Sequence, residues 1–211
     1  MSKEETSFKK MVLALSLVSA IASTSLGIIY ALTKDTISEA RKLQKQNAIK
    51  TVLPDFDNDP LEKIDKRNVD GDTLYFYYAE QNGKWIGTAV ETFTNKGFSG
   101  KFRLMVSFTP DGNIYNLSIL EHHETPGLGD KIEKEKSLDK NTGKSWSSQF
   151  EGKNPGEFRL SVKKDGGDVD AITAATISSR AFCDAVQRAY NEYIMVIKEN
   201  PTGGNERANK K

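Results

Sequence analysis

The sequence predicts an α+β protein that is anchored in a membrane by one helix near its N-terminus. Three observations carry this prediction: an apolar stretch without a charged residue from Met11 to Thr33, four closely spaced β-prone segments, and an amphipathic helical pattern near the C-terminus. Short turns such as Gln81-Asn82-Gly83 and Pro110-Asp111-Gly112 separate the β-prone segments. Turns of this length join antiparallel strands, so we expect a mainly antiparallel sheet followed by a helix.

The apolar stretch 11–33 is predicted to be a transmembrane helix. At about 1.5 Å per residue it is about 34 Å long, enough to cross a hydrocarbon core of about 30 Å. A cleaved signal peptide is the alternative, because Lys9-Lys10 and Ala20-Ile21-Ala22 resemble its first and last regions. The apolar run continues well beyond Ala22, and this favours a retained anchor. Basic residues lie on both sides of the stretch, so local charge does not determine its orientation.

After the anchor, the sequence divides into a stalk, one globular domain and a tail. Residues 34–54 have helical periodicity and end at Pro54, which predicts a stalk helix. We place the globular domain at 55–199 and a flexible tail at 200–211, where Pro and Gly replace apolar clusters. Residues 55–72 are expected to form a loop. The predicted strands are Thr73–Ala79, Lys84–Phe93, Lys101–Thr109, Asn113–Glu121 and a further strand through Phe158, Leu160 and Val162.

Composition excludes several classes of function. The 211 residues carry 30 Lys and Arg against 29 Asp and Glu, so no bulk charge indicates nucleic-acid binding. Cys183 is the one cysteine, which excludes an internal disulfide framework, and it is expected to be buried. His122 and His123 are adjacent and would point to opposite faces of a strand, so they make a poor metal pair. The residues predict neither a metal site nor a catalytic set.

Two motifs are candidates for ligand binding. Glu124-Thr125-Pro126-Gly127-Leu128-Gly129 combines residues with special backbone freedom, so it forms either a tight turn or a loop that approaches a ligand closely. Asp170-Ala171-Ile172-Thr173-Ala174-Ala175-Thr176-Ile177-Ser178-Ser179 precedes and begins the last helical pattern. A helix start rich in hydroxyls favours an anion, although Ser178 or Ser179 as a simple helix cap is the more common role. The residues alone thus support a ligand-binding domain held at a membrane.

The same motifs resemble a known family. Asp170–Thr176 is similar to the D-x-x-[S/T]-G-A-T signature of domains that bind FMN covalently, and Glu124–Gly129 matches their E-T-P-G-L-G loop. Gly97-Phe98-Ser99-Gly100 resembles their G-[Y/F]-x-G segment. With the anchor and the strand order, the likeness extends to the G subunits of Rnf-type ion-translocating electron-transport complexes. The C subunits of Na⁺-translocating NADH:quinone reductases share the signature, and an FMN-binding module outside either complex is a further alternative.

The resemblance implies a site for one flavin. Thr176 would carry FMN through a phosphoester, and Asp170 would belong to the signature that a Mg²⁺-dependent flavin transferase recognises, or else be a turn acid. Ala174 stands where the family commonly has Gly, which would restrict the backbone if φ must be positive. The resemblance also assigns residues around the flavin and its phosphate: Thr173, Ala174, Ala175, Ser178, Glu124, Thr125, Gly127, Leu128 and Lys131.

The resemblance further implies a location and partners. Residues 1–10 would be cytoplasmic, and the domain would lie on the periplasmic side of the cytoplasmic membrane. There it would relay electrons, within a complex that couples transfer between ferredoxin and NAD⁺ to Na⁺ or H⁺ movement. Expected partners are the other subunits of that complex and the flavin transferase, with no nucleic acid. The chain would have no complete enzyme activity alone.

Overall fold

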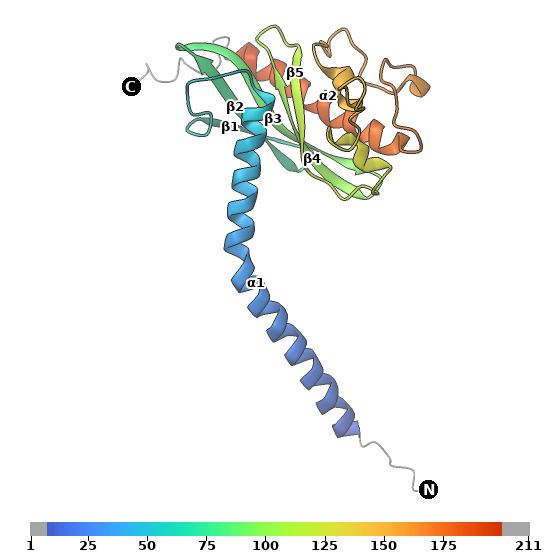
Figure 1. The fold of residues 1–211 in the computed structure, drawn as a ribbon. Coiled ribbons are helices and arrows are strands. Elements are labelled where there is room, and N and C mark those ends of the chain that lie inside the picture. Colours follow the sequence, from blue (N-terminus) through green and yellow to red (C-terminus); the bar gives the residue numbers. More distant parts are fainter. Residues whose placement is uncertain (1–7, 200–211) are drawn as a thin grey trace. The chain divides into compact units, whose positions relative to one another are not determined.

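The computed structural model describes residues 8–199 (Figure 1). The predicted flexible tail and most of the predicted N-terminal segment 1–10 lie outside the described residues. By internal packing the chain divides into two units, Met1–Gln44 and Lys45–Lys211. In chain order the helices and strands are α1 (Phe8–Val52), β1 (Ile64–Val69), β2 (Asp72–Gln81), β3 (Lys84–Gly97), β4 (Gly100–Phe108), β5 (Ile114–Glu121) and α2 (Thr176–Glu199).

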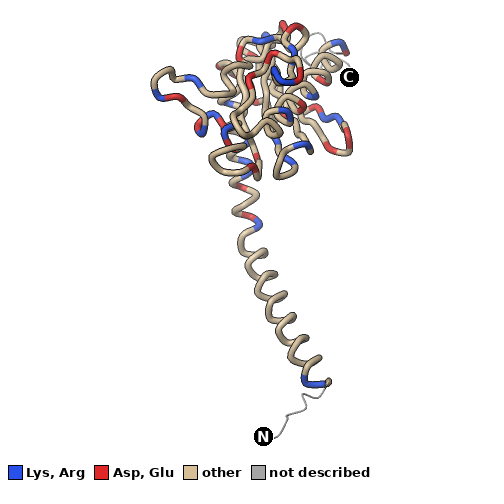
Figure 2. The backbone as a smooth tube through the Cα atoms, turned by 90° about the vertical axis from the view of Figure 1, so that its right-hand side faces the viewer, with Lys and Arg blue, Asp and Glu red and all other residues tan. Residues whose placement is uncertain are grey.

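Helix α1 contains both the predicted transmembrane segment and almost all of the predicted stalk. Figure 2 shows its uncharged stretch as an unbroken run between charged residues near both of its ends. This stretch is long and apolar enough to cross a membrane, and none of it is buried within the protein. The hydroxyls of Thr24 and Thr33 donate to Ala20 O and Ile29 O, so these polar groups are satisfied inside the helix. The helix ends at Val52. The next residue, Leu53, precedes Pro54, and the α conformation is disfavoured for a residue before proline.

The five strands form one antiparallel sheet in the order β1-β2-β3-β4-β5. Each face of the sheet contributes to a buried hydrophobic cluster. One face contributes Phe76, Val90 and Val106 to a core with α2, while the other packs Tyr77 and Met105 against the last turns of α1. The predicted α+β class is therefore confirmed, including the mainly antiparallel sheet and the C-terminal helix.

Two predictions of secondary structure are wrong. Strand β1 lies inside 55–72, which was predicted to be a loop. The prediction failed because the strand sequence Ile-Asp-Lys-Arg-Asn-Val is polar, as is usual at an exposed edge of a sheet. The predicted strand through Phe158, Leu160 and Val162 is absent from the described residues apart from an isolated bridge between Val162 and Val169. Phe158 and Leu160 pack against the core as side chains, but their backbone has no neighbouring strand with which to pair.

Aromatic contacts fix the position of α2 at its N-terminal half. The ring of Phe182 lies 5.0 Å from the rings of both Trp146 and Phe150, which belong to a short 3-10 helix (Trp146–Phe150). Such ring pairs add to the stability that burial gives. Trp146 also donates its indole N–H to Asp170 O at 2.6 Å. The segment that leads into α2 is thus held on the same aromatic cluster as the helix itself.

Candidate functional site

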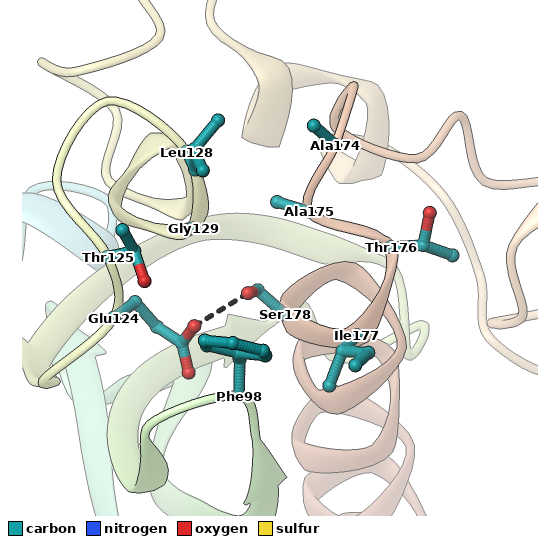
Figure 3. Close-up of a pocket in the computed structure, with 10 residues that line it drawn as sticks. All are labelled: Phe98, Glu124, Thr125, Leu128, Gly129, Ala174, Ala175, Thr176, Ile177 and Ser178. Carbon is teal, nitrogen blue, oxygen red and sulfur yellow. Dashed lines mark hydrogen bonds between the residues drawn. The ribbon is translucent and has the colours of Figure 1, made fainter.

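A cavity of about 290 Å³ lies at the N-terminal end of α2 (Figure 3). It is formed where three separate parts of the chain meet: the tip of the β3–β4 hairpin, the loop that follows β5, and the start of α2. Its volume is near the lower end of the range for small-molecule sites, which is about 300–1,000 Å³. The lining residues are Phe98, Glu124, Thr125, Leu128, Gly129, Ala174, Ala175, Thr176, Ile177 and Ser178.

The backbone before α2 is tied down by Ser179. Its hydroxyl accepts the N–H of Ile172 at 2.9 Å and donates to Ala175 O at 3.0 Å, so it closes the turn that leads into the helix. Ala174 lies inside this turn with φ at 62°, the left-handed region that favours glycine. The condition stated for Ala174 is therefore met: the backbone has positive φ at a position occupied by a residue with a Cβ.

The first N–H groups of α2 have no acceptor within the helix. The helix begins at Thr176, and Ser179 is the first residue of the turn whose N–H reaches a carbonyl in the helical pattern, that of Ala175. The N–H groups of Thr176, Ile177 and Ser178 precede it and have no helical acceptor. Together with the helix dipole they favour an anion at this end.

Thr176 is half-buried at the edge of the pocket. In Figure 3 its hydroxyl points away from Glu124 and Thr125. Thr176 therefore places a half-buried, hydroxyl-bearing side chain beside a helix start that favours an anion.

Glu124 lies on the inner side of the pocket and is 5% exposed. Its Oε2 accepts the hydroxyl proton of Ser178 at 2.7 Å, and its Oε1 accepts the N–H of Ser99 at 3.3 Å. Its own N–H donates to Nδ1 of His122 at 3.0 Å. Glu124 forms no ion pair with any residue in the described range 8–199.

Three apolar side chains at the pocket remain exposed. The exposed fractions are 66% for Phe98, 40% for Leu128 and 47% for Ile177. Exposed apolar groups around a cavity are typical of sites that cover an apolar ligand. Gly129 also lines the cavity but is itself buried, beside Glu124 and Ser178. The donor set at the helix start and these apolar walls fit a ligand that has both a phosphate and a flat aromatic ring, as FMN does.

The structure brings together seven of the predicted site residues and separates the others. The predicted residues that line the pocket are Glu124, Thr125, Leu128, Ala174, Ala175, Thr176 and Ser178. Thr173, Gly127 and Lys131 do not line it. Asp170 also lies outside, and its exposed side chain pairs with Lys163 at 2.7 Å.

Sequence reasoning missed three lining residues. They are Phe98, Gly129 and Ile177. Phe98 and Gly129 occur within the G-F-S-G and E-T-P-G-L-G motifs, so the motifs were the signal that could have identified them. Ile177 adjoins Thr176 and carried no separate signal.

Ser178 and Ser179 lie in the first turn of α2, and their hydroxyls bond to other parts of the chain. Neither Ser178 nor Ser179 is a helix cap, because both lie inside α2. Ser178 is 1% exposed and its hydroxyl donates to Glu124, while its place beside a phosphate stays a prediction. The predicted burial of Cys183 is confirmed, and burial raises the pKa of its thiol to about 12. No metal-binding cluster of His, Cys, Asp or Glu occurs among the described residues.

Comparison with known proteins identifies the class of domain and then the family of the chain. Residues 97–191 match the model of the FMN-binding domain, a range that contains the whole pocket. The chain is 34% identical over 189 residues to the G subunit of the ion-translocating oxidoreductase complex of Erwinia tasmaniensis, an alignment that covers 85% of this chain and 87% of the relative. The corresponding G subunit of Salmonella typhi is 37% identical (81% and 84% covered), and that of Haemophilus influenzae strain PittEE is 38% identical (76% and 78% covered). The chain belongs to the family of G subunits of ion-translocating oxidoreductase complexes, and it contains an FMN-binding domain.

Proposed function

We propose that this chain is the flavin-carrying subunit of an ion-translocating oxidoreductase complex, and that FMN attached to Thr176 relays electrons there. The observation that carries the proposal is the position of Thr176. It is the first residue of α2, it lines the pocket, and it is only half-buried. Membership of the G-subunit family supports the complex, because the relatives are named as subunits of one.

The attachment is a phosphoryl transfer to Thr176. Its Oγ1 forms a bond to the phosphorus of the FMN half of FAD, and the bond between the two phosphates breaks. AMP leaves, and the hydroxyl proton passes to a base of the flavin transferase. The β-branched side chain of threonine is stiff at χ1, so the acceptor oxygen is held in few orientations. The Asp170 side chain, exposed outside the pocket, is available for recognition by that transferase.

The residues of the pocket bind and shield the cofactor. The N–H groups at the start of α2 would hold the phosphate, and Phe98, Leu128 and Ile177 would cover the aromatic ring. Bound flavin supplies the chemistry, which is the acceptance and release of electrons. A site of this kind needs no substrate pocket of its own, so the chain acts as a carrier and has no complete activity alone.

We place the flavin domain on the periplasmic side of the cytoplasmic membrane. A helix of the right length precedes the domain, and an ester bond would prevent loss of the flavin to the outside. A membrane-impermeant amine reagent applied to intact spheroplasts tests this placement. Labelling of lysines in 55–199 is expected, whereas labelling only after the membrane is opened would overturn it.

Intact mass spectrometry tests the attachment. Co-production with a flavin transferase should add one FMN less one water, and the peptide that contains Thr176 should carry it after denaturation. Thr176→Ala should abolish the addition, while Thr142→Ala, at an exposed threonine outside the pocket and outside the signature, should retain it. The assignment is refuted if Thr176→Ala still carries the added FMN mass, or if acid precipitation releases the flavin.

A further inference from the structure

Three motifs that are far apart in the sequence meet at one carboxylate. Glu124 comes from the loop after β5, its Oε2 accepts from Ser178 in the first turn of α2, and its Oε1 accepts from Ser99 at the tip of the β3–β4 hairpin. Figure 3 shows the bond between Ser178 and Glu124 with Phe98 beside it. One side chain therefore joins all three parts of the chain that form the pocket.

Two glycines make room for this carboxylate. A Cβ on Gly129 would lie 2.6 Å from Glu124 Oε2 and 2.7 Å from Ser178 Oγ. A Cβ on Gly97 would lie 2.5 Å from Glu124 Oε1 and 2.3 Å from Gly100 O. Atoms do not approach so closely, so any side chain at either position would displace the carboxylate. Glycine is therefore needed at both positions for Glu124 to occupy this place.

Burial of the Glu124 carboxylate costs desolvation free energy, which indicates that the arrangement has a role. A buried carboxylate without a cation is unfavourable, and two hydrogen bonds offset only part of the desolvation. Glu91 shows the contrast, because it is equally buried at 5% but pairs with Lys45 and Arg103 and accepts from Tyr77. Glu124 has only neutral donors among the described residues, and each of them belongs to a segment of the pocket.

We propose that Glu124 is a positioning residue that cross-links the β3–β4 hairpin to the first turn of α2, and so sets the geometry in which Thr176 receives and holds FMN. The inference rests on the proposed function for its consequence, but the cross-link itself is a property of the unmodified chain. In this cross-link the Ser178 hydroxyl donates to Glu124. The Ser99 N–H donates to the same carboxylate, and its neighbour Phe98 lines the pocket.

The first test uses the full-length protein without flavin, purified in detergent. In Glu124→Ala the exchange of backbone hydrogens at 97–100 should speed up about tenfold, as expected for the loss of one hydrogen bond. Glu124→Gln should stay close to the unmodified protein, because its Oε1 still accepts from Ser99 and its amide can take the other position beside the Ser178 hydroxyl oxygen, donating to it. Glu91→Ala is the matched control: it removes an equally buried carboxylate and should lower the melting temperature without changing exchange at 97–100.

The second test measures the rate of FMN attachment by intact mass, with purified flavin transferase, FAD and Mg²⁺, below the melting temperature of every variant. Glu124→Ala and Gly129→Ala should slow attachment about tenfold or more, since small misplacements of reacting groups are costly. Glu124→Gln should restore the rate, and Glu91→Ala should not alter it.

The proposal is overturned if Glu124→Ala keeps the wild-type rates of hydrogen exchange at 97–100 and of FMN attachment. It is also overturned if Glu124→Gln is as impaired as Glu124→Ala, because the charge and not the cross-link would then matter. If the unaltered chain itself never receives FMN, the proposed function fails, whereas the exchange experiment still decides the role of Glu124.

Discussion

Replacement of Ala174 by glycine should stabilise the protein, which is the opposite of the usual effect of this change. Ala174 has φ at 62°, and a residue with a Cβ in the left-handed region costs roughly 1–2 kcal/mol. Glycine removes this strain but gives the unfolded chain more freedom, which offsets about 0.4–1 kcal/mol. Ala174 is exposed, so little packing is lost. The expected net gain is about 0.5–1 kcal/mol in the free energy of unfolding.

For a folded unit of this size the gain corresponds to a rise in melting temperature of about 1–4 °C, measured by thermal unfolding in detergent. Ala171→Gly is the matched control, because Ala171 lies in the same turn segment without positive φ. It should lower the free energy of unfolding by about 0.5–1 kcal/mol. The reasoning is refuted if Ala174→Gly destabilises the protein as Ala171→Gly does. The same variant should also accelerate attachment of FMN at Thr176, because the backbone before the acceptor is no longer strained.

Three further predictions concern other parts of the fold. Burial raises the pKa of Asp184, but hydrogen bonds from Lys96 and Thr94 and the charge of Arg188 outweigh it and hold the pKa below the usual value of 3.8. Its stabilising effect is therefore present above the unfolded pKa and lost as pH falls through the folded one, so Asp184→Asn should flatten the acid limb of a stability–pH curve; an unchanged slope would contradict this. Cys183, whose pKa burial raises to about 12, should resist iodoacetamide at pH ~8 until the protein unfolds, and rapid native labelling would show that it is accessible. Lys45→Met should cost about 1 kcal/mol in chemical denaturation, because Glu91 loses one of its cations, whereas an unaltered midpoint would show that its other partners suffice.

The agreement between sequence and fold is closest where the determining interactions are local. An uncharged run long enough to cross a membrane requires no tertiary contact to become a helix, and α1 extends through it. Hairpin turns such as Gln81-Asn82-Gly83 connect neighbouring strands, so the central strands were predictable from spacing. Strand β1 was not, because its polar residues gain their structure from the pairing with β2.

The sequence by itself determined the α+β class, the helix long enough to span a membrane, and the motif that makes Thr176 the proposed acceptor, since each depends on residues close together in the chain. Tertiary structure alone decided the interior of the pocket. Ser178 and Glu124 are 54 positions apart, yet the Ser178 hydroxyl donates to the Glu124 carboxylate in the folded chain, a contact that no local motif indicates. The physical reason is that a hydroxyl has one proton to donate, and only the folded chain shows which acceptor receives it.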